Sequence, residues 1–255
     1  MSRAALAFVV ALGVALPPAA ADDERAPLPW CHADFEALAD DVCFHAGKID
    51  EGRRTLVIFL HGLVQKGAGW QHNQQLAILR GARRLGFAVL APRGRDGINR
   101  SGGPDMVAWP TGQEARRNHE AAVLAEWSAA RREAEKRLGK PFDEVFVVGF
   151  SNGAYYGSSL ALRAAAPVDG YAVFAGGIGM PSPLPPGAPR PPVFVGIAGK
   201  DSTAKDSRAL AKALAKHHFP HKAVTRQVGH TIADAHLDEA IAWLRKQVDA
   251  REPKK

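Results

Sequence analysis

The chain has 255 residues, of which 46% are hydrophobic, and it carries a formal net charge of +7. That length and apolar content fit one sizeable domain with a large core better than two small domains. Although the chain is basic, both signs of charge alternate along residues 114–140, as they do on the solvated face of a helix. The pattern argues against a nucleic-acid-binding stripe, although an excess of positive charge still attracts anionic substrates or surfaces.

The first residues have the layout of a signal peptide. Arg3 precedes an apolar run, and small residues that end at Ala21 resemble a cleavage site. A membrane anchor is the alternative, but the run of about 13 residues is shorter than the roughly 20 that a helix needs to cross a bilayer. We expect residues 1–21 to be removed on export to the periplasm or the cell exterior. Residues 22–255 are then expected to form a single domain without a membrane span.

Export changes the interpretation of the two cysteines, Cys31 and Cys43. Oxidising compartments allow two such thiols to pair, so we expect a disulfide, with two free thiols as the alternative. The neighbouring His32 and His45 raise the question of a metal site. Because the four residues lack the paired spacing of a zinc finger, we expect no metal.

Six short apolar stretches, rich in β-branched or aromatic residues, predict strands in the rest of the chain. They cover residues 55–60, 87–92, 144–150, 170–176, 192–199 and 222–228. Longer helix-compatible segments separate most of them. Strands that are apolar along their whole length and alternate with helices predict a mostly parallel sheet with helices on both faces, which is the α/β class. The segment before the first strand shows no such pattern, and we expect it to be irregular.

Two segments predict long loops. Residues 177–192 are rich in proline, which excludes a regular helix and limits any cap inserted there to a short coil. Residues 93–113 are long and rich in glycine, and such loops in a compact domain are often functional. We expect this second loop to form a wall of the functional site.

A serine stands between two glycines directly after the strand at residues 144–150. The stretch Gly149-Phe150-Ser151-Asn152-Gly153 precedes a segment whose small residues suit a helix packed close to a sheet. A sharp turn from strand to helix needs small residues on both sides of the serine, because the bend brings their backbones together. Such a turn exposes the hydroxyl at a helix N-terminus, where negative charge is stabilised. The alternative is an ordinary loop serine.

A serine hydroxyl becomes a good nucleophile only when a base removes its proton, so a histidine and a carboxylate are expected downstream. Asp201 follows the strand at residues 192–199, where its carboxylate would project from the carboxyl end of the sheet. Its alternative role is to cap the next helix. His230 lies in a loop between the last strand and the terminal helix. Asp206 and Asp234 are the fallback acids, but both fall inside predicted helices.

The fourth element is His61-Gly62, which directly follows the first strand. Acyl transfer needs two donors aimed at the oxyanion, typically worth about 3 kcal/mol each. The backbone N–H groups of Leu63 and Asn152 are the candidates. A simple turn after a strand is the alternative interpretation of His61-Gly62.

Three aromatic residues lie near these motifs in the sequence. Trp109, Tyr155 and Tyr156 are candidates to line the binding cleft, since an aromatic ring can stack on an acyl or aryl group. Simple core packing is the alternative for each.

The motifs in this chain order, "FLHGL", "GFSNGA", "GIAGKD" and "VGHTI", resemble those of the α/β-hydrolase superfamily over nearly the whole mature chain. Within it, the chain is similar to the phospholipase/carboxylesterase and polyhydroxybutyrate depolymerase-like esterases. The resemblance implies a central sheet without a large cap domain and a Ser151–His230–Asp201 triad. It also implies oxyanion amides from Leu63 and Asn152, and hydrolysis of small-molecule or polymeric carboxylic esters without a cofactor. Carboxylesterases of that group usually carry glutamine after the nucleophile, where this chain has Asn152.

The expected mechanism is attack by Ser151 on the ester carbonyl, with His230 moving the proton and Asp201 orienting the imidazole. An amidase, peptidase or thioesterase would use the same triad, and a binding protein could keep the fold without turnover. A nucleotide-binding Rossmann protein would need a G-x-G-x-x-G turn after the first strand. That strand is followed instead by His61-Gly62-Leu63-Val64, which excludes the Rossmann interpretation.

Overall fold

The structure is a computed structural model that describes residues 28–39, 41–48, 52–98, 103–178 and 187–251. The predicted signal peptide at residues 1–21 lies outside the described residues, as do residues 179–186 of the proline-rich loop. No helix within the described ranges combines the length and the apolar character needed to cross a membrane.

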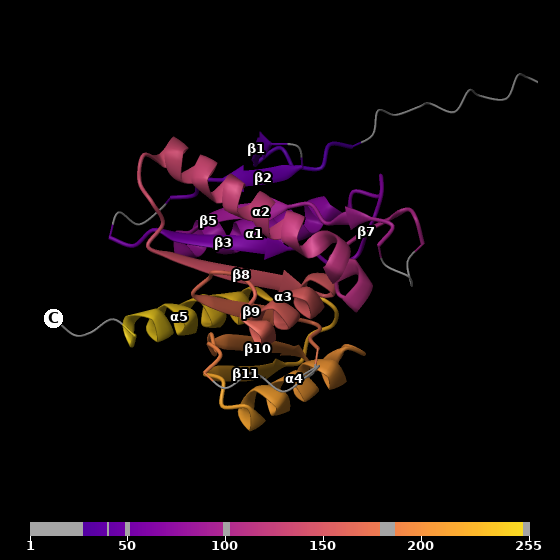
Figure 1. Ribbon diagram of the computed structural model, residues 1–255, viewed down its shortest axis with the longest axis vertical. Helices are drawn as coiled ribbons and strands as arrows, with labels where there is room; N and C mark the ends of the chain where they lie inside the picture. Colours follow the sequence, from indigo (N-terminus) through magenta and orange to yellow (C-terminus); the bar gives the residue numbers. More distant parts are fainter. Residues whose placement is uncertain (1–27, 40, 49–51, 99–102, 179–186, 252–255) are drawn as a thin grey trace, which may run out of the picture.

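An eight-stranded sheet forms the middle of the fold, in the order β1-β2-β5-β3-β8-β9-β10-β11 (Figure 1). The six strands from β5 to β11 run parallel, whereas β2 pairs antiparallel with β5, and β1 with β2. The strands are β1 Glu36–Ala39, β2 Val42–His45, β3 Thr55–Leu60, β5 Ala88–Pro92, β8 Glu144–Phe150, β9 Gly170–Phe174, β10 Val193–Ala198 and β11 His221–Arg226. All six predicted strands are present, with ends within two residues of the prediction.

Five helices cover the two faces of the sheet within the described part of the chain. They are α1 Trp70–Leu85, α2 Gln113–Leu138, α3 Asn152–Arg163, α4 Ala204–Lys216 and α5 Asp234–Asp249. Because successive strand side chains point to opposite faces, Val145 and Val147 of β8 pack with α2, α3 and α4, whereas Phe146 and Val148 pack with α1 and α5. Figure 1 shows α2, α3 and α4 on the near side of the sheet. This two-faced burial confirms the predicted α/β class.

The segment before β3 differs from the prediction, because it is not irregular. Residues of β1 and β2 form an antiparallel hairpin that extends the sheet, with Cys43 opposite Ala91 of β5. The predicted disulfide between Cys31 and Cys43 is confirmed, and it ties the chain before the hairpin to β2. These strands were missed because each has only four residues, and the alanine-rich β1 carries little strand propensity.

The glycine-rich loop at residues 93–113 also contains short strands. Its β6 (Arg95–Asp96) and β7 (Met106–Ala108) join β4 (Val64–Gln65) in a second, three-stranded antiparallel sheet. Since β4 begins one residue after Leu63, this small sheet anchors the chain that leaves the end of β3.

The strand order reverses between β3 and β8. From β3 the chain passes to β5 on one side of the sheet and later returns to β8 on the other side. In open α/β sheets such a point leaves a crevice at the carboxyl ends of the two strands, where ligands bind. Leu63 and Ser151 both follow those carboxyl ends.

The opposite ends of β3 and β8 are held by one buried acid. The Glu144 side chain is only 1% exposed and accepts two hydrogen bonds from Arg53, at 2.9 and 2.6 Å. It also accepts hydrogen bonds from Thr55 Oγ1 and from Arg245 on α5. The carboxylate therefore joins two strands and the terminal helix. Such a group stabilises the fold only while its partners satisfy it.

We expect Glu144→Ala to lower the free energy of unfolding by about 3 kcal/mol or more, because it removes the buried carboxylate that the partly buried Arg53 and Arg245 guanidinium groups share. Urea denaturation followed by circular dichroism measures this change. The matched control is Glu133→Ala, which removes an exposed acid paired with Arg137 one helical turn away, and should cost at most about 0.5 kcal/mol. If the two substitutions lowered stability equally, Glu144 would not be the group that holds β3, β8 and α5 together.

Candidate active site

Ser151 occupies the turn between β8 and α3 in a backbone conformation that non-glycine residues rarely adopt. Its φ is 51° and its ψ is −116°. Strain of this kind persists only where surrounding contacts enforce it, and it is concentrated at functional sites. Here the Ser151 amide donates to the Phe174 carbonyl at 3.0 Å, and its own carbonyl accepts from Ala154 and Tyr155 in α3. The turn is therefore held from both sides.

The two glycines around Ser151 are required by close backbone approaches. A Cβ atom at Gly149 would lie 2.3 Å from the Gly153 carbonyl oxygen. A Cβ atom at Gly153 would lie 2.1 Å from the carbonyl oxygen of Leu60, the last residue of β3. No side chain fits at either separation, so the glycines let the start of α3 pack directly on β3.

His230 lies between Ser151 and Asp201 and contacts both. Its Nε2 is 2.9 Å from Ser151 Oγ, and its Nδ1 is 2.5 Å from Asp201 Oδ2. An ionised carboxylate only accepts hydrogen bonds, so Nδ1 carries the proton and Nε2 is free to accept the serine hydroxyl. The imidazole packs on the Phe150 ring with centroids 4.9 Å apart, and its side chain is 45% exposed. A substrate can reach the histidine from solvent.

Asp201 is the acid of this arrangement, and its side chain is 5% exposed. Its carboxylate also accepts hydrogen bonds from the hydroxyl of Thr203 at 2.9 Å and from the Thr203 amide at 3.2 Å. Burial pushes the pKa of Asp201 up, but the hydrogen bonds from His230 and Thr203 outweigh it and hold the pKa below its ordinary value. The carboxylate is therefore ionised where it faces the imidazole.

The two fallback acids lie elsewhere. Asp206, on α4, accepts a hydrogen bond of 2.5 Å from the Tyr155 hydroxyl. Asp234 begins α5 and pairs with Arg80 and Arg84 of α1. Neither carboxylate is the one that His230 contacts.

The Leu63 amide lies in the chain that follows β3, and the Asn152 amide directly follows Ser151 at the start of α3. A Cβ atom at Gly62 would lie 3.1 Å from Ser151 Cβ, so the chain after β3 passes directly beside the nucleophile candidate. Among the described residues, neither amide donates to another protein group. Both N–H groups are available to an oxygen bound above Ser151.

Comparison with solved structures identifies the architecture, whereas the sequence matches no family model and no curated protein. YahD, in a structure with malic acid, is 18% identical with a TM-score of 0.59, over 81% of this chain and 98% of that one. A Bacillus cereus carboxylesterase is 19% identical with a TM-score of 0.57, over 81% and 93%. A Mesorhizobium loti carboxylesterase is 22% identical with a TM-score of 0.55, over 80% and 93%. The chain has the α/β-hydrolase fold.

In this hydrolase fold the side chain of His61 holds the loop after β3, a role that sequence reasoning missed. His61 is 2% exposed, and burial lowers its pKa to about 4, so the ring is neutral. Its Nδ1 donates to the Gly62 carbonyl, and its Nε2 accepts from the Gly94 amide at 3.0 Å. A neutral imidazole thus joins the loops that follow β3 and β5.

Gln74 of α1 is a second positioning residue that sequence reasoning missed. Its Oε1 accepts a hydrogen bond from the Gly62 amide at 2.6 Å. This contact orients the His61–Gly62 peptide bond, one residue before the Leu63 amide. Nothing local in the sequence marks Gln74, because the contact depends on how α1 packs against the loop. In the sequence, only the position of His61-Gly62 directly after the first strand pointed to a role for His61.

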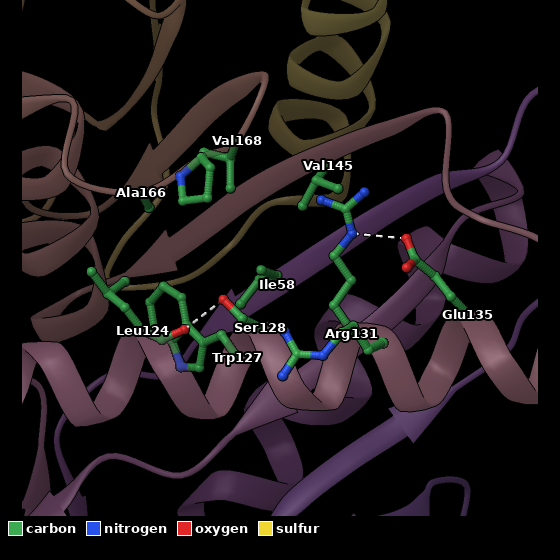
Figure 2. A pocket seen from close by; sticks show the side chains of 11 residues that line it. Ile58, Leu124, Trp127, Ser128, Arg131, Glu135, Val145, Ala166 and Val168 are labelled. Carbon is green, nitrogen blue, oxygen red and sulfur yellow. Dashed lines mark hydrogen bonds and ion pairs between the residues drawn. The ribbon is translucent and has the colours of Figure 1, made fainter.

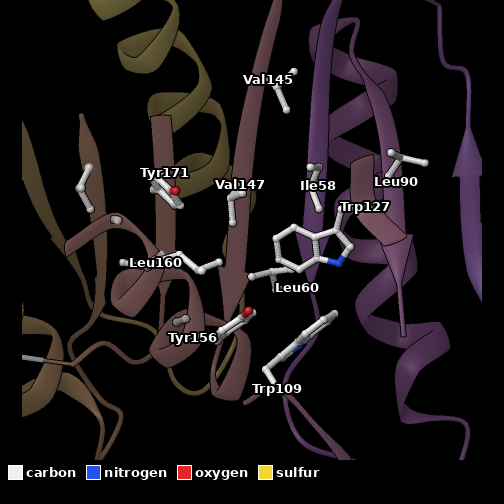
Figure 3. Close-up of a cluster of buried hydrophobic side chains, with 14 of the residues drawn as sticks. Ile58, Leu60, Leu90, Trp109, Trp127, Val145, Val147, Tyr156, Leu160 and Tyr171 are labelled. Carbon is white, nitrogen blue, oxygen red and sulfur yellow. The ribbon is translucent and has the colours of Figure 1, made fainter. Parts of the chain in front are cut away.

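The aromatic candidates need a correction. Trp109 and Tyr156 are 1% and 0% exposed and stack with parallel rings, centroids 5.9 Å apart, at one end of the buried cluster in Figure 3. They pack in the core of the hydrolase fold and do not line a cleft. Trp109 still supports the site, because its indole N–H donates to the His61 carbonyl and its amide donates to Asn152 Oδ1. Tyr155, which is partly exposed, remains a cleft candidate.

A separate hollow lies at the far end of the sheet. It has a volume of about 270 Å³, and Figure 2 shows Trp127, Ser128 and Arg131 of α2 facing Ile58 and Val145 across it. Val145 is near the start of β8, whereas Ser151 follows its end, a separation of roughly 20 Å along the strand. This hollow therefore does not receive a substrate for Ser151. Within the described ranges, no group of three or more His, Cys, Asp or Glu residues is placed to hold a metal.

We expect Gly153→Ala to lower the free energy of unfolding by about 3 kcal/mol, because the added methyl group forces β3 and α3 apart. Urea denaturation gives the change. Gly157→Ala in the same helix is the matched control, since its Cβ atom would find only ordinary contacts at 3.6 Å or more. That substitution should leave stability unchanged or raise it by up to about 1 kcal/mol. A tolerated Gly153→Ala would mean that β3 and α3 pack less closely.

Proposed function

We propose that the protein is an exported serine hydrolase that cleaves carboxylic esters through Ser151, His230 and Asp201. The observation that carries the proposal is the continuous hydrogen-bond chain from Ser151 Oγ through His230 to Asp201 Oδ2, at 2.9 and 2.5 Å. It stands at the strand-order reversal of an α/β-hydrolase fold, on a strained turn. A nucleophile, a base and an orienting acid in contact are what acyl transfer requires.

The proposed reaction begins when Ser151 Oγ attacks the ester carbonyl carbon while its proton moves to His230 Nε2. The ionised Asp201 stabilises the resulting imidazolium through Nδ1. The negative charge that develops on the carbonyl oxygen is accepted by the Leu63 and Asn152 amides, each worth about 3 kcal/mol in such sites. The C–O bond to the alcohol then breaks, and His230 returns the proton to the departing oxygen. Water, activated by the same histidine, hydrolyses the acyl-enzyme.

Two further observations support the proposal. Two of the structures similar in fold are named carboxylesterases, which favours ester substrates. The Cys31–Cys43 disulfide fits an oxidising compartment, which supports export. An ester rather than an amide is also the less demanding substrate, because an alkoxide leaves more readily than the anion of an amine, so an amide needs its nitrogen protonated before the bond breaks.

We expect a fluorophosphonate probe to form a single adduct on Ser151 and p-nitrophenyl acetate to be hydrolysed by the mature chain. Intact-protein mass spectrometry detects the adduct, and absorbance follows the released nitrophenolate. Ser151→Ala should abolish the adduct and lower turnover by at least about 10³-fold. A folded protein that takes no adduct and turns over no ester would contradict the proposal. Parallel measurement of the matching anilide shows whether an amide is cleaved instead.

Asp201→Asn should lower kcat by about 10⁴-fold, because an amide in that position favours the wrong imidazole tautomer and does not stabilise the imidazolium. Asp206→Asn is the matched control, since Asp206 lies five residues further on and contacts Tyr155 rather than His230. Its kcat should stay within a few-fold of the parent. If Asp206→Asn lowers kcat strongly and Asp201→Asn does not, Asp206 rather than Asp201 is the acid that orients His230.

A further inference from the structure

The indole of Trp30 packs against the buried imidazole of His61. Their ring centroids lie 5.0 Å apart at an interplanar angle of 66°, and the Trp109 ring contacts the same imidazole with centroids 4.9 Å apart. Trp30 belongs to residues 28–32, which we call the N-terminal arm. Among the described residues the Trp30 indole N–H has no hydrogen-bond partner, so Trp30 acts on His61 through ring contact and burial.

The imidazole of His61 fixes the direction of a candidate oxyanion donor. Its Nδ1 donates to the Gly62 carbonyl at 2.5 Å. That carbonyl belongs to the same peptide unit as the Leu63 N–H, and the unit is trans, so the C=O and N–H bonds point in opposite directions. Because His61 holds the carbonyl on its own side, the Leu63 N–H points away from the imidazole.

This arrangement requires the neutral form of His61. Its Nε2 accepts a hydrogen bond from the Gly94 amide at 3.0 Å, and a protonated imidazole has no acceptor left. A proton on Nε2 would set two N–H groups against each other and push the loop after β3 away from the loop after β5. Burial lowers the pKa of His61 to about 4, so the imidazole is neutral well below pH 7.

Arg93 is the charged group that acts on this imidazole among the described residues. The hydrogen bond to Gly62 raises the pKa of His61 and the positive charge of Arg93 lowers it, both by less than burial does. Ion pairs with Asp41 at 3.4 Å and with Asp96 at 2.5 Å hold the guanidinium group. Because these pairs do not involve Trp30, removal of the indole changes the burial of His61 rather than the position of the charge.

The N-terminal arm holds Trp30 in contact with His61. Gln75 of α1 donates to the Trp30 carbonyl at 3.1 Å and accepts a hydrogen bond from the His32 amide at 2.7 Å. The disulfide ties Cys31, which lies between them, to Cys43 of β2. Three successive residues of the arm are therefore anchored, and the indole is in place before a substrate binds.

We propose that Trp30 is a positioning residue for ester hydrolysis, because it keeps water from His61, and His61 then holds the Leu63 amide in the direction that the oxyanion needs. This inference rests on the proposed function and adds to it a residue that touches neither the triad nor the substrate. A whole oxyanion donor is worth about 10²- to 10³-fold in kcat, and a displaced donor loses part of that. The contact should act on kcat more than on KM, because the amide serves charge that develops only in the transition state.

In Trp30→Ala, water reaches the imidazole and the pKa of His61 rises toward its ordinary value of 6.5. His61 is then neutral at about pH 8 and largely protonated at about pH 5, whereas in the parent it stays mostly neutral at both. We expect kcat for p-nitrophenyl acetate, relative to the parent at the same pH, to lie within about threefold at the higher pH and to fall about tenfold further at the lower. The contribution of the triad to the pH dependence is common to both proteins and cancels in this ratio.

Two further variants control for the loss of a large side chain. Trp30→Phe keeps an aromatic ring against His61 and should recover most of the loss at the lower pH. Trp243→Ala removes another partly buried indole, one that contacts Phe194 rather than His61, and should follow the parent over the whole pH range. Circular dichroism at each pH shows whether the variants are folded. A folded Trp30→Ala whose kcat follows the parent at every pH would overturn the inference.

A measurement without substrate separates this inference from the proposed function. The NMR signal of the His61 Cε1–H group, identified by its loss in His61→Asn, reports protonation of the imidazole. Between about pH 8 and about pH 5 it should hardly move in the parent and should titrate in Trp30→Ala. A parent that hydrolyses no ester contradicts the proposed function, while Trp30-dependent titration would still support the shielding of His61. Titration of His61 that is the same with and without Trp30 would overturn the shielding.

Discussion

The close approach of the Gly153 backbone to the end of β3 is the constraint on which the site depends. With no side chain at Gly153, the first turn of α3 packs directly against the Leu60 carbonyl. That contact helps to hold Ser151 at a positive φ, and the Ser151 hydroxyl lies 2.9 Å from His230 Nε2. It also brings the ends of β3 and β8 together, so the Leu63 amide, which follows β3, and the Asn152 amide, which follows Ser151, come from neighbouring strand ends. The strain at Ser151 is tolerated because the packed elements on both sides leave the chain no alternative path.

A layer of buried polar contacts supports this turn. His61 joins the loops after β3 and β5, Gln74 orients the Gly62 peptide, and the Asn152 side chain binds the Trp109 amide. Each of these groups is satisfied within the protein, so none has to be desolvated when a substrate binds. In the proposed mechanism the Leu63 and Asn152 donors would therefore be preorganised, which is the property that lowers the barrier for charge development in acyl transfer.

Stability and chemistry are separated along the sheet. The Glu144 cluster holds the starting ends of β3 and β8, while Ser151 and Leu63 follow their carboxyl ends. The N-terminal arm adds a third part, because the Cys31–Cys43 disulfide and the hydrogen bond from the His32 amide to Gln75 fix it to β2 and α1.

Much of the fold follows from local patterns. The six strands β3, β5, β8, β9, β10 and β11 and the glycines around Ser151 were readable in the sequence, because strand burial and tight turns impose residue types at fixed spacing. The order of Ser151, Asp201 and His230 was readable too. The hairpin of β1 and β2 was not, since its stability comes from pairing with β5 and from the disulfide rather than from its own composition. The burial of Trp109 and Tyr156 was likewise decided by the tertiary structure. These features depend on distances between segments remote in the chain, and side-chain packing, strand pairing and the disulfide set those distances together.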